Sequence, residues 1–87
     1  MKTAEECKKE LLSVIENKYR KEFNNIDEEL NHAIYVNEER FTSFEVDLET
    51  KDIQLFKEIL KNHGYLVSQE IESTNDNFSK VTYKICF

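Results

Sequence analysis

The stretch FEVDLETKDIQLFKEILKNHGYLV, residues 44–67, decides the fold, because its hydrophobic period changes twice. In its first five residues apolar and acidic side chains alternate, which predicts a strand with one buried and one solvated face. Thr50 then predicts the cap of a helix over residues 51–63, where the apolar residues recur at helical spacing. Gly64, the only glycine, suits the left-handed residue that ends a helix. A strand, a helix and a second strand are therefore expected in this order.

A further strand is predicted downstream, and a long helix upstream. After the polar loop 73–77, apolar residues alternate again up to residue 87, which predicts a hairpin. Upstream, Thr3-Ala4-Glu5-Glu6 has the pattern of a capping box, and helical spacing then persists to about residue 37. Asn24-Asn25 is the expected kink. Ala-Ile-Tyr-Val at 33–36 also suits a short strand, but we favour helix there.

These elements predict one α+β domain over residues 1–87. In the order α-β-α-β-β, a long helix at about 4–37 and a short second helix cover one face of a three-stranded sheet, and the α+β body spans about 41–87. Two-layer sandwiches of this kind bury one face of the sheet and leave the other open. The predicted strand order is 1-3-2, with the last strand in the centre.

The long helix predicts a homodimer. A straight helix of this length would extend about 50 Å, beyond the body of so small a domain. Either a bend at Asn24-Asn25 folds the apolar stripe back onto itself, or the protruding half packs against a second copy, which is the alternative we favour. Its apolar stripe exceeds what one sheet and one short helix are expected to cover, and soluble monomers avoid large exposed apolar patches. The residues predicted for self-association are Leu12, Ile15, Tyr19, Phe23, Ile26 and Leu30.

The charge is concentrated in the middle of the chain. The net charge is −6, but residues 22–49 hold nine Asp and Glu against Arg40 alone, which gives −8. Such a segment repels nucleic acid, whose binding depends on Lys and Arg. It suits a basic protein surface or serves only as a solvated face. The residues predicted to bind a partner are Glu38, Glu39, Phe41, Glu45, Asp47 and Glu49.

Other residue patterns exclude several functional classes. One glycine cannot form a phosphate-binding loop. No apolar run is long enough to span a membrane, and the Lys- and Glu-rich start is unlike a secretory signal, so a cytoplasmic protein is expected. Two cysteines and two histidines are scattered singly, which predicts free thiols and no metal site. The carboxylate pair Glu45 and Asp47 has no predicted pocket, so no catalytic residue, cofactor or enzymatic activity is expected.

The pattern resembles small proteins of tailed bacteriophages. The resemblance covers roughly residues 10–87 and is carried by the Ile26, Leu30, Ala33-Ile34 stripe, the Phe44–Leu48 alternation, the Leu60–Val67 corner and the Tyr83-Lys84-Ile85 strand. It implies a virion component, an early protein, or an inhibitor of a host nuclease such as an anti-CRISPR protein.

Three functional hypotheses follow from these observations. The first is a non-enzymatic, phage-encoded inhibitor of a host factor or defence system, acting in the bacterial cytoplasm through its acidic surface. The second is a phage structural or assembly protein that acts by self-association. The third is a protein that sequesters a small signalling nucleotide between copies, around Lys18, Arg20 and Lys21.

Overall fold

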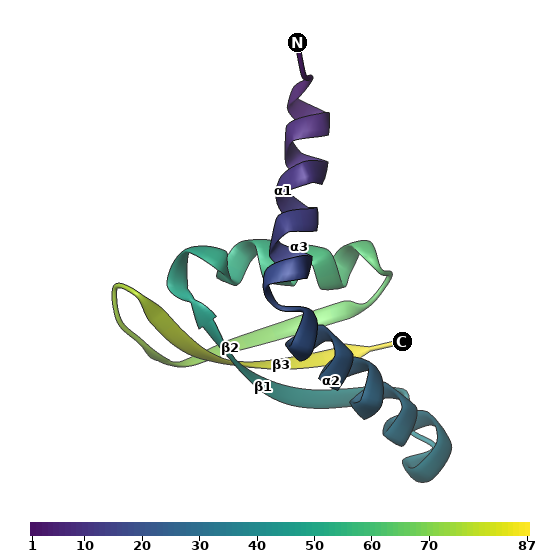
Figure 1. Ribbon diagram of the computed structural model, residues 1–87. Coiled ribbons are helices and arrows are strands. Elements are labelled where there is room, and N and C mark those ends of the chain that lie inside the picture. The colour runs from purple at the N-terminus through teal and green to yellow at the C-terminus, as the bar shows by residue number, and fades with distance from the viewer.

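Helices cover one face of a three-stranded antiparallel sheet in the computed structural model, which describes residues 1–87 (Figure 1). This architecture confirms the predicted α+β sandwich and its element order. The elements are α1 (Ala4–Lys18), α2 (Arg20–His32), a π-helical turn (Ala33–Asn37), β1 (Phe41–Glu49), a 3-10 turn (Thr50–Asp52), α3 (Ile53–Asn62), β2 (Leu66–Thr74) and β3 (Phe78–Cys86). The helices α2 and α3 pack on the strands, and α1 packs on α3.

The last strand occupies the centre of the sheet, as predicted. The order is β1-β3-β2, and β3 pairs antiparallel with both neighbours, so that Thr82 lies between Glu45 and Glu70. Successive side chains of β3 alternate between the two faces. Tyr83 and Ile85 are fully buried beneath the helices, whereas Lys84 between them is exposed on the other face. The sheet therefore has one covered and one open face.

The helical segment bends at Tyr19. Tyr19 separates α1 from α2 with φ −110° and ψ 30°. Its hydroxyl donates a hydrogen bond to Asp52 Oδ2 at 2.7 Å and accepts one from the Glu49 N–H at 3.0 Å. The kink expected at Asn24-Asn25 is wrong, because both residues lie exposed in the middle of α2. The bend follows from contacts with residues about thirty positions away, which helical propensity does not report.

The two ends of the helical segment follow local sequence signals. The predicted capping box is confirmed at its first residue, since Thr3 Oγ1 accepts a hydrogen bond from the Glu6 N–H at 3.1 Å. At the other end residues 33–37 are helical, as favoured, in π form. Glu38 then adopts the left-handed conformation with φ 54°, and the Glu39 N–H donates to the Ala33 carbonyl at 2.9 Å. These contacts turn the chain into β1.

The ends of α3 agree only in part with expectation. Gly64 has φ 91°, which confirms the predicted left-handed residue after the helix. Thr50 does not cap the helix, because a 3-10 turn precedes α3 and shifts its start to Ile53. Instead the Thr50 hydroxyl donates to the Asn75 carbonyl at 2.8 Å and lies 2.9 Å from Ser79 Oγ. Thr50 thus ties this turn to the β2–β3 hairpin.

The stripe predicted for self-association belongs to the core of the single chain. Phe56 of α3 stacks on Phe23 with ring centroids 4.6 Å apart and meets the edge of Tyr19 at 5.8 Å. The bend at Tyr19 directs α2 towards β1, so the stripe covers α3 and the sheet. The prediction that a second copy covers it is therefore wrong. Four of its residues are buried and two are half-buried: Ile15, Tyr19, Ile26 and Leu30, and Leu12 and Phe23.

The first half of α1 extends beyond the body of the protein (Figure 1). All of residues 1–11 are exposed. Leu11 and Val14 face solvent with 46% and 59% of their surfaces exposed. The expected overhang is thus present, but it is shorter than a straight helix to residue 37 would give.

Candidate functional site

The acidic stretch 22–49 folds into two elements that pack against each other, α2 and β1, joined by the π-helical turn. A groove of about 480 Å³ lies between them. We call it the acidic groove. Its lining comprises Lys21, Glu22, Asn25, Ile26 and Glu29 from α2, and Ser43, Phe44, Glu45, Val46 and Asp47 from β1.

The acidic groove runs along the free edge of the sheet. Five consecutive residues of β1 line it, although their side chains alternate between the two faces. Only the edge of a strand can present such a run. β1 is an edge strand whose sole strand partner is β3, and the other edge of residues 43–47 makes no backbone hydrogen bond within the chain.

The chemistry of the acidic groove combines an apolar floor with carboxylate walls. Ile26 and Val46 are buried and Phe44 is half-buried, and they form the floor. Four carboxylates line the walls, and Lys21 is the only base. Glu45 lies 3.4 Å from Lys80 of β3 in an ion pair that is about half exposed. The other three carboxylates, on Glu22, Glu29 and Asp47, form no ion pair within the chain.

Three of the predicted partner-binding residues outside the groove lie near the start of β1. Glu38 and Glu39 are exposed in the turn before the strand. Phe41 is 41% exposed on the open face, where Lys84 Nζ lies 4.6 Å from its ring centroid. With Glu45 and Asp47 in the groove, five of the six predicted residues border one continuous strip of β1.

Glu49, the sixth predicted residue, is placed elsewhere. It forms an ion pair with Lys18 at the junction of α1 and α2, and only a third of its side chain is exposed. Glu49 ends β1 where the chain turns towards α3, so alternation along the strand no longer determines its surroundings.

The prediction missed Glu22 and Glu29, although their spacing of seven residues places them on one face of a helix.

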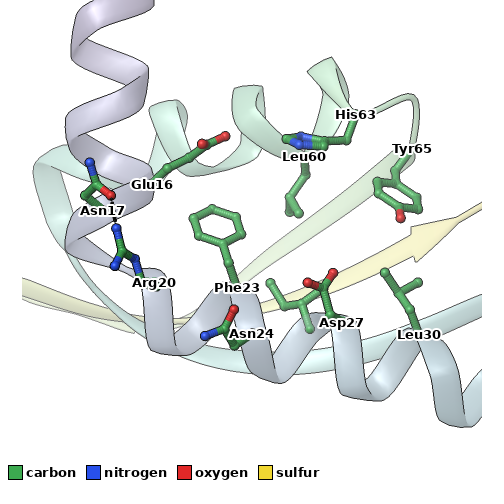
Figure 2. A pocket seen from close by; sticks show the side chains of 11 residues that line it. Glu16, Asn17, Arg20, Phe23, Asn24, Asp27, Leu30, Leu60, His63 and Tyr65 are labelled. Atoms are coloured by element: carbon green, nitrogen blue, oxygen red, sulfur yellow. Dashed lines mark hydrogen bonds between the residues drawn. The ribbon is translucent and has the colours of Figure 1, made fainter.

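A second groove of about 370 Å³ lies on the other side of α2 (Figure 2). In Figure 2 the side chain of Phe23 points up from α2 between the labelled residues of α1 and those near the end of α3. Arg20 hydrogen-bonds Asn17 at 2.5 Å, and the carboxylates of Glu16 and Asp27 also line this groove. His63 lies at the far end, with Nδ1 2.9 Å from the Ile59 carbonyl. The basic and acidic groups here are mixed.

The basic residues proposed to bind a nucleotide point to three different places. Lys18 contacts Asp52 at 2.7 Å in the core junction. Arg20 lines the second groove, and Lys21 lines the acidic groove. A phosphate group requires several such donors in one place, and the single chain does not gather these three.

No protein-family model, curated protein or solved structure matches this chain. None of the helices combines the length and the apolar character that a membrane crossing needs.

The side chains whose pKa is clearly shifted are buried in the core. No group of three or more His, Cys, Asp or Glu side chains is placed to hold a metal ion. Burial raises the pKa of the Tyr19 and Tyr83 hydroxyls above their ordinary values. Burial also acts to raise the pKa of Asp52, but hydrogen bonds from Lys18 and Tyr19 outweigh it and lower that pKa. These three groups lie in the packed core and line neither groove.

Proposed function

We propose that this protein is a non-enzymatic binding protein that docks a basic surface of a partner protein through the acidic groove and the adjoining start of β1. One observation carries the proposal: apart from Lys21, every residue that lines the groove comes from the −8 stretch 22–49, and an apolar floor lies between its carboxylates. Charge brings a basic partner to such a surface and sets its orientation, while desolvated apolar contacts hold it.

Different residues of the surface attract the partner by charge and anchor it by apolar contact. Glu38, Glu39 and Asp47 are exposed and form no ion pair, so they are free to attract and orient a partner. Phe41 and Phe44 supply apolar surface at the start of the strip and in the groove. Aromatic side chains of this kind are common anchors in protein interfaces.

The partner class that we propose is a basic host protein of the bacterial cytoplasm, such as a nuclease or another nucleic-acid-binding protein. Proteins of this class carry basic surfaces because they neutralise phosphates. The resemblance to small tailed-phage proteins adds the biological role of an inhibitor of a host factor or defence system, as anti-CRISPR proteins are.

Affinity capture from a bacterial lysate, with matched variants, tests this proposal. We expect the wild-type protein to retain a basic protein at low salt and to release it as salt rises. The variant Glu45→Lys/Asp47→Lys should lose it. The control Glu70→Lys/Glu72→Lys makes the same charge change on β2, the opposite edge strand, and should retain it. Equal capture by all three proteins would refute the role of the acidic groove.

A second candidate function, self-association of a structural protein, is supported by one different observation. Ala4, Cys7, Leu11 and Val14 follow one another at spacings of three and four residues on the overhanging part of α1, and all four are exposed. A helix of this kind gains stability when its apolar stripe packs on another helix.

A further inference from the structure

The free edge of β1 is the feature of the acidic groove that the docking proposal leaves unused. An edge strand presents unpaired amide and carbonyl groups that can accept another strand. Along residues 43–47 these groups are open to the groove and make no hydrogen bond within the chain. A docked partner that only matched the charges would leave them to water.

We infer that the acidic groove binds an extended, Lys/Arg-rich segment of the partner, which adds to the sheet as a fourth strand beside β1. This inference rests on the proposed function and specifies its partner. Strand addition obtains affinity from backbone hydrogen bonds and selectivity from alternate side chains. The groove has both elements: a free strand edge, and side chains on each side of it.

The two faces of the added strand would meet different surroundings. Residues directed to the open face would lie beside Glu45 and Asp47, so Lys or Arg fits there. Residues directed under α2 would lie over Phe44 and Ile26. The long stems of Lys or Arg pack on such a floor while their charged ends reach Glu22 and Glu29 on the groove wall.

The same charges disfavour a second copy of β1 as the occupant. Antiparallel pairing of two β1 edges would place the acidic residues of the copies opposite one another, and like charges across a strand pair are destabilising. Charged residues on an edge strand are a general protection against self-pairing. Here the protection is selective, because it leaves the edge open to a strand of opposite charge.

The test uses a short synthetic peptide that alternates Lys and Thr, together with two matched peptides. In one, Glu replaces Lys; in the other, every backbone nitrogen is methylated, which keeps the charge and removes the hydrogen-bond donors of both strand edges. Binding is followed by fluorescence anisotropy. Amide hydrogen exchange then reports which strand of the full chain becomes protected.

We expect the Lys peptide to bind and to protect amides of β1 but not of β2. Methylation and the variant Glu29→Lys/Asp47→Lys should each weaken binding at least tenfold, while Glu70→Lys/Glu72→Lys should leave it within twofold. The Glu peptide should not bind. Slower exchange confined to β1 is a signature that charge attraction alone does not produce.

Two outcomes would overturn strand addition and leave the proposed function standing. One is equal binding of the methylated peptide with no protection of β1. The other is no peptide binding at all, although a basic protein is captured from lysate in a manner that depends on Glu45 and Asp47. If neither the peptide nor a basic protein binds, both the inference and the proposed function fail.

Discussion

The hydroxyl of Tyr19 donates a 2.7 Å hydrogen bond to Asp52 Oδ2, and this contact joins the bend between α1 and α2 to the start of α3. Lys18 Nζ lies 2.7 Å from the same oxygen. The Glu49 N–H donates to the Tyr19 hydroxyl from the end of β1. The Asp52 carboxylate and the Tyr19 phenol thus connect the bend between α1 and α2 to the end of β1 and the start of α3.

Removal of the phenol hydroxyl should destabilise the fold without removing its ring. Tyr19→Phe keeps the aromatic contact with Phe56 but removes one of the two hydrogen bonds to the Asp52 carboxylate, that of Lys18 remaining, and leaves the Glu49 amide without its partner. We expect the free energy of unfolding to fall by about 1–2 kcal/mol, measured by urea denaturation. Tyr35→Phe is the control, because Tyr35 is 80% exposed. Equal stability of Tyr19→Phe and the wild type would contradict this role.

The stabilising effect of Asp52 should disappear in acid. Its pKa is below the 3.8 of an ordinary carboxyl, because the hydrogen bonds of Lys18 and Tyr19 to the charged form exceed the effect of burial. A lowered folded-state pKa means stabilisation that is complete above the unfolded-state pKa and is lost as the pH falls through the folded-state value. The difference in unfolding free energy between wild type and Asp52→Asn should therefore be constant from pH 7 to about pH 5 and shrink below about pH 4. A difference that does not change with pH would show that the charge of Asp52 contributes nothing.

Phe56 should be the most sensitive core position. Its side chain is fully buried and its ring contacts three others: Tyr19, Phe23 and Tyr83. Phe56→Ala would leave a cavity where α1, α2, α3 and the sheet meet, so we expect a loss of about 3–5 kcal/mol. Thermal unfolding followed by circular dichroism measures it. Phe78→Ala, at a position 59% exposed, should change the melting temperature little. Similar losses at both positions would contradict the described core.

Any homodimer of this chain should depend on the overhang of α1. The residues predicted for that contact are buried or half-buried, which leaves Leu11 and Val14 as the large apolar side chains exposed on α1. If two copies associate, light scattering should give a mass that rises above 10.4 kDa over a tenfold increase in concentration. Leu11→Lys/Val14→Lys should return the mass to that of one chain without lowering the melting temperature. A constant mass of one chain for the wild-type protein would contradict the homodimer.

Sequence reasoning succeeded where a local pattern determines the structure. Alternation in Phe44–Leu48, the single Gly64 and the final apolar alternation defined the strand–helix–strand unit and the 1-3-2 sheet. It failed at Tyr19, because the bend is stabilised by Asp52 and Glu49, which are distant in the chain. The estimate of uncovered apolar surface assumed a straight helix and was therefore wrong, since a bend at Tyr19 turns the whole of α2 onto the body.

The sequence predicted only part of the candidate site, because the rest depends on contacts between elements that are distant in the chain. The strip of β1 with Glu45 and Asp47 follows from strand alternation, and it is exposed as expected. Glu22 and Glu29 share the groove with it only because α2 packs beside β1. That neighbour relation is tertiary, and no spacing within either element reveals it.

The central position of β3 has a consequence for the order in which the protein can fold during synthesis. β1 and β2 do not pair with each other; each pairs only with β3, which follows both of them in the sequence. While the ribosome is still translating residues 78–86, the helices can form, but both earlier strands lack a partner. Completion of the sheet therefore waits until residues 78–86 have left the exit tunnel. A chain that has emerged only as far as β2 would expose two unpaired strands, the kind of species that aggregates most readily.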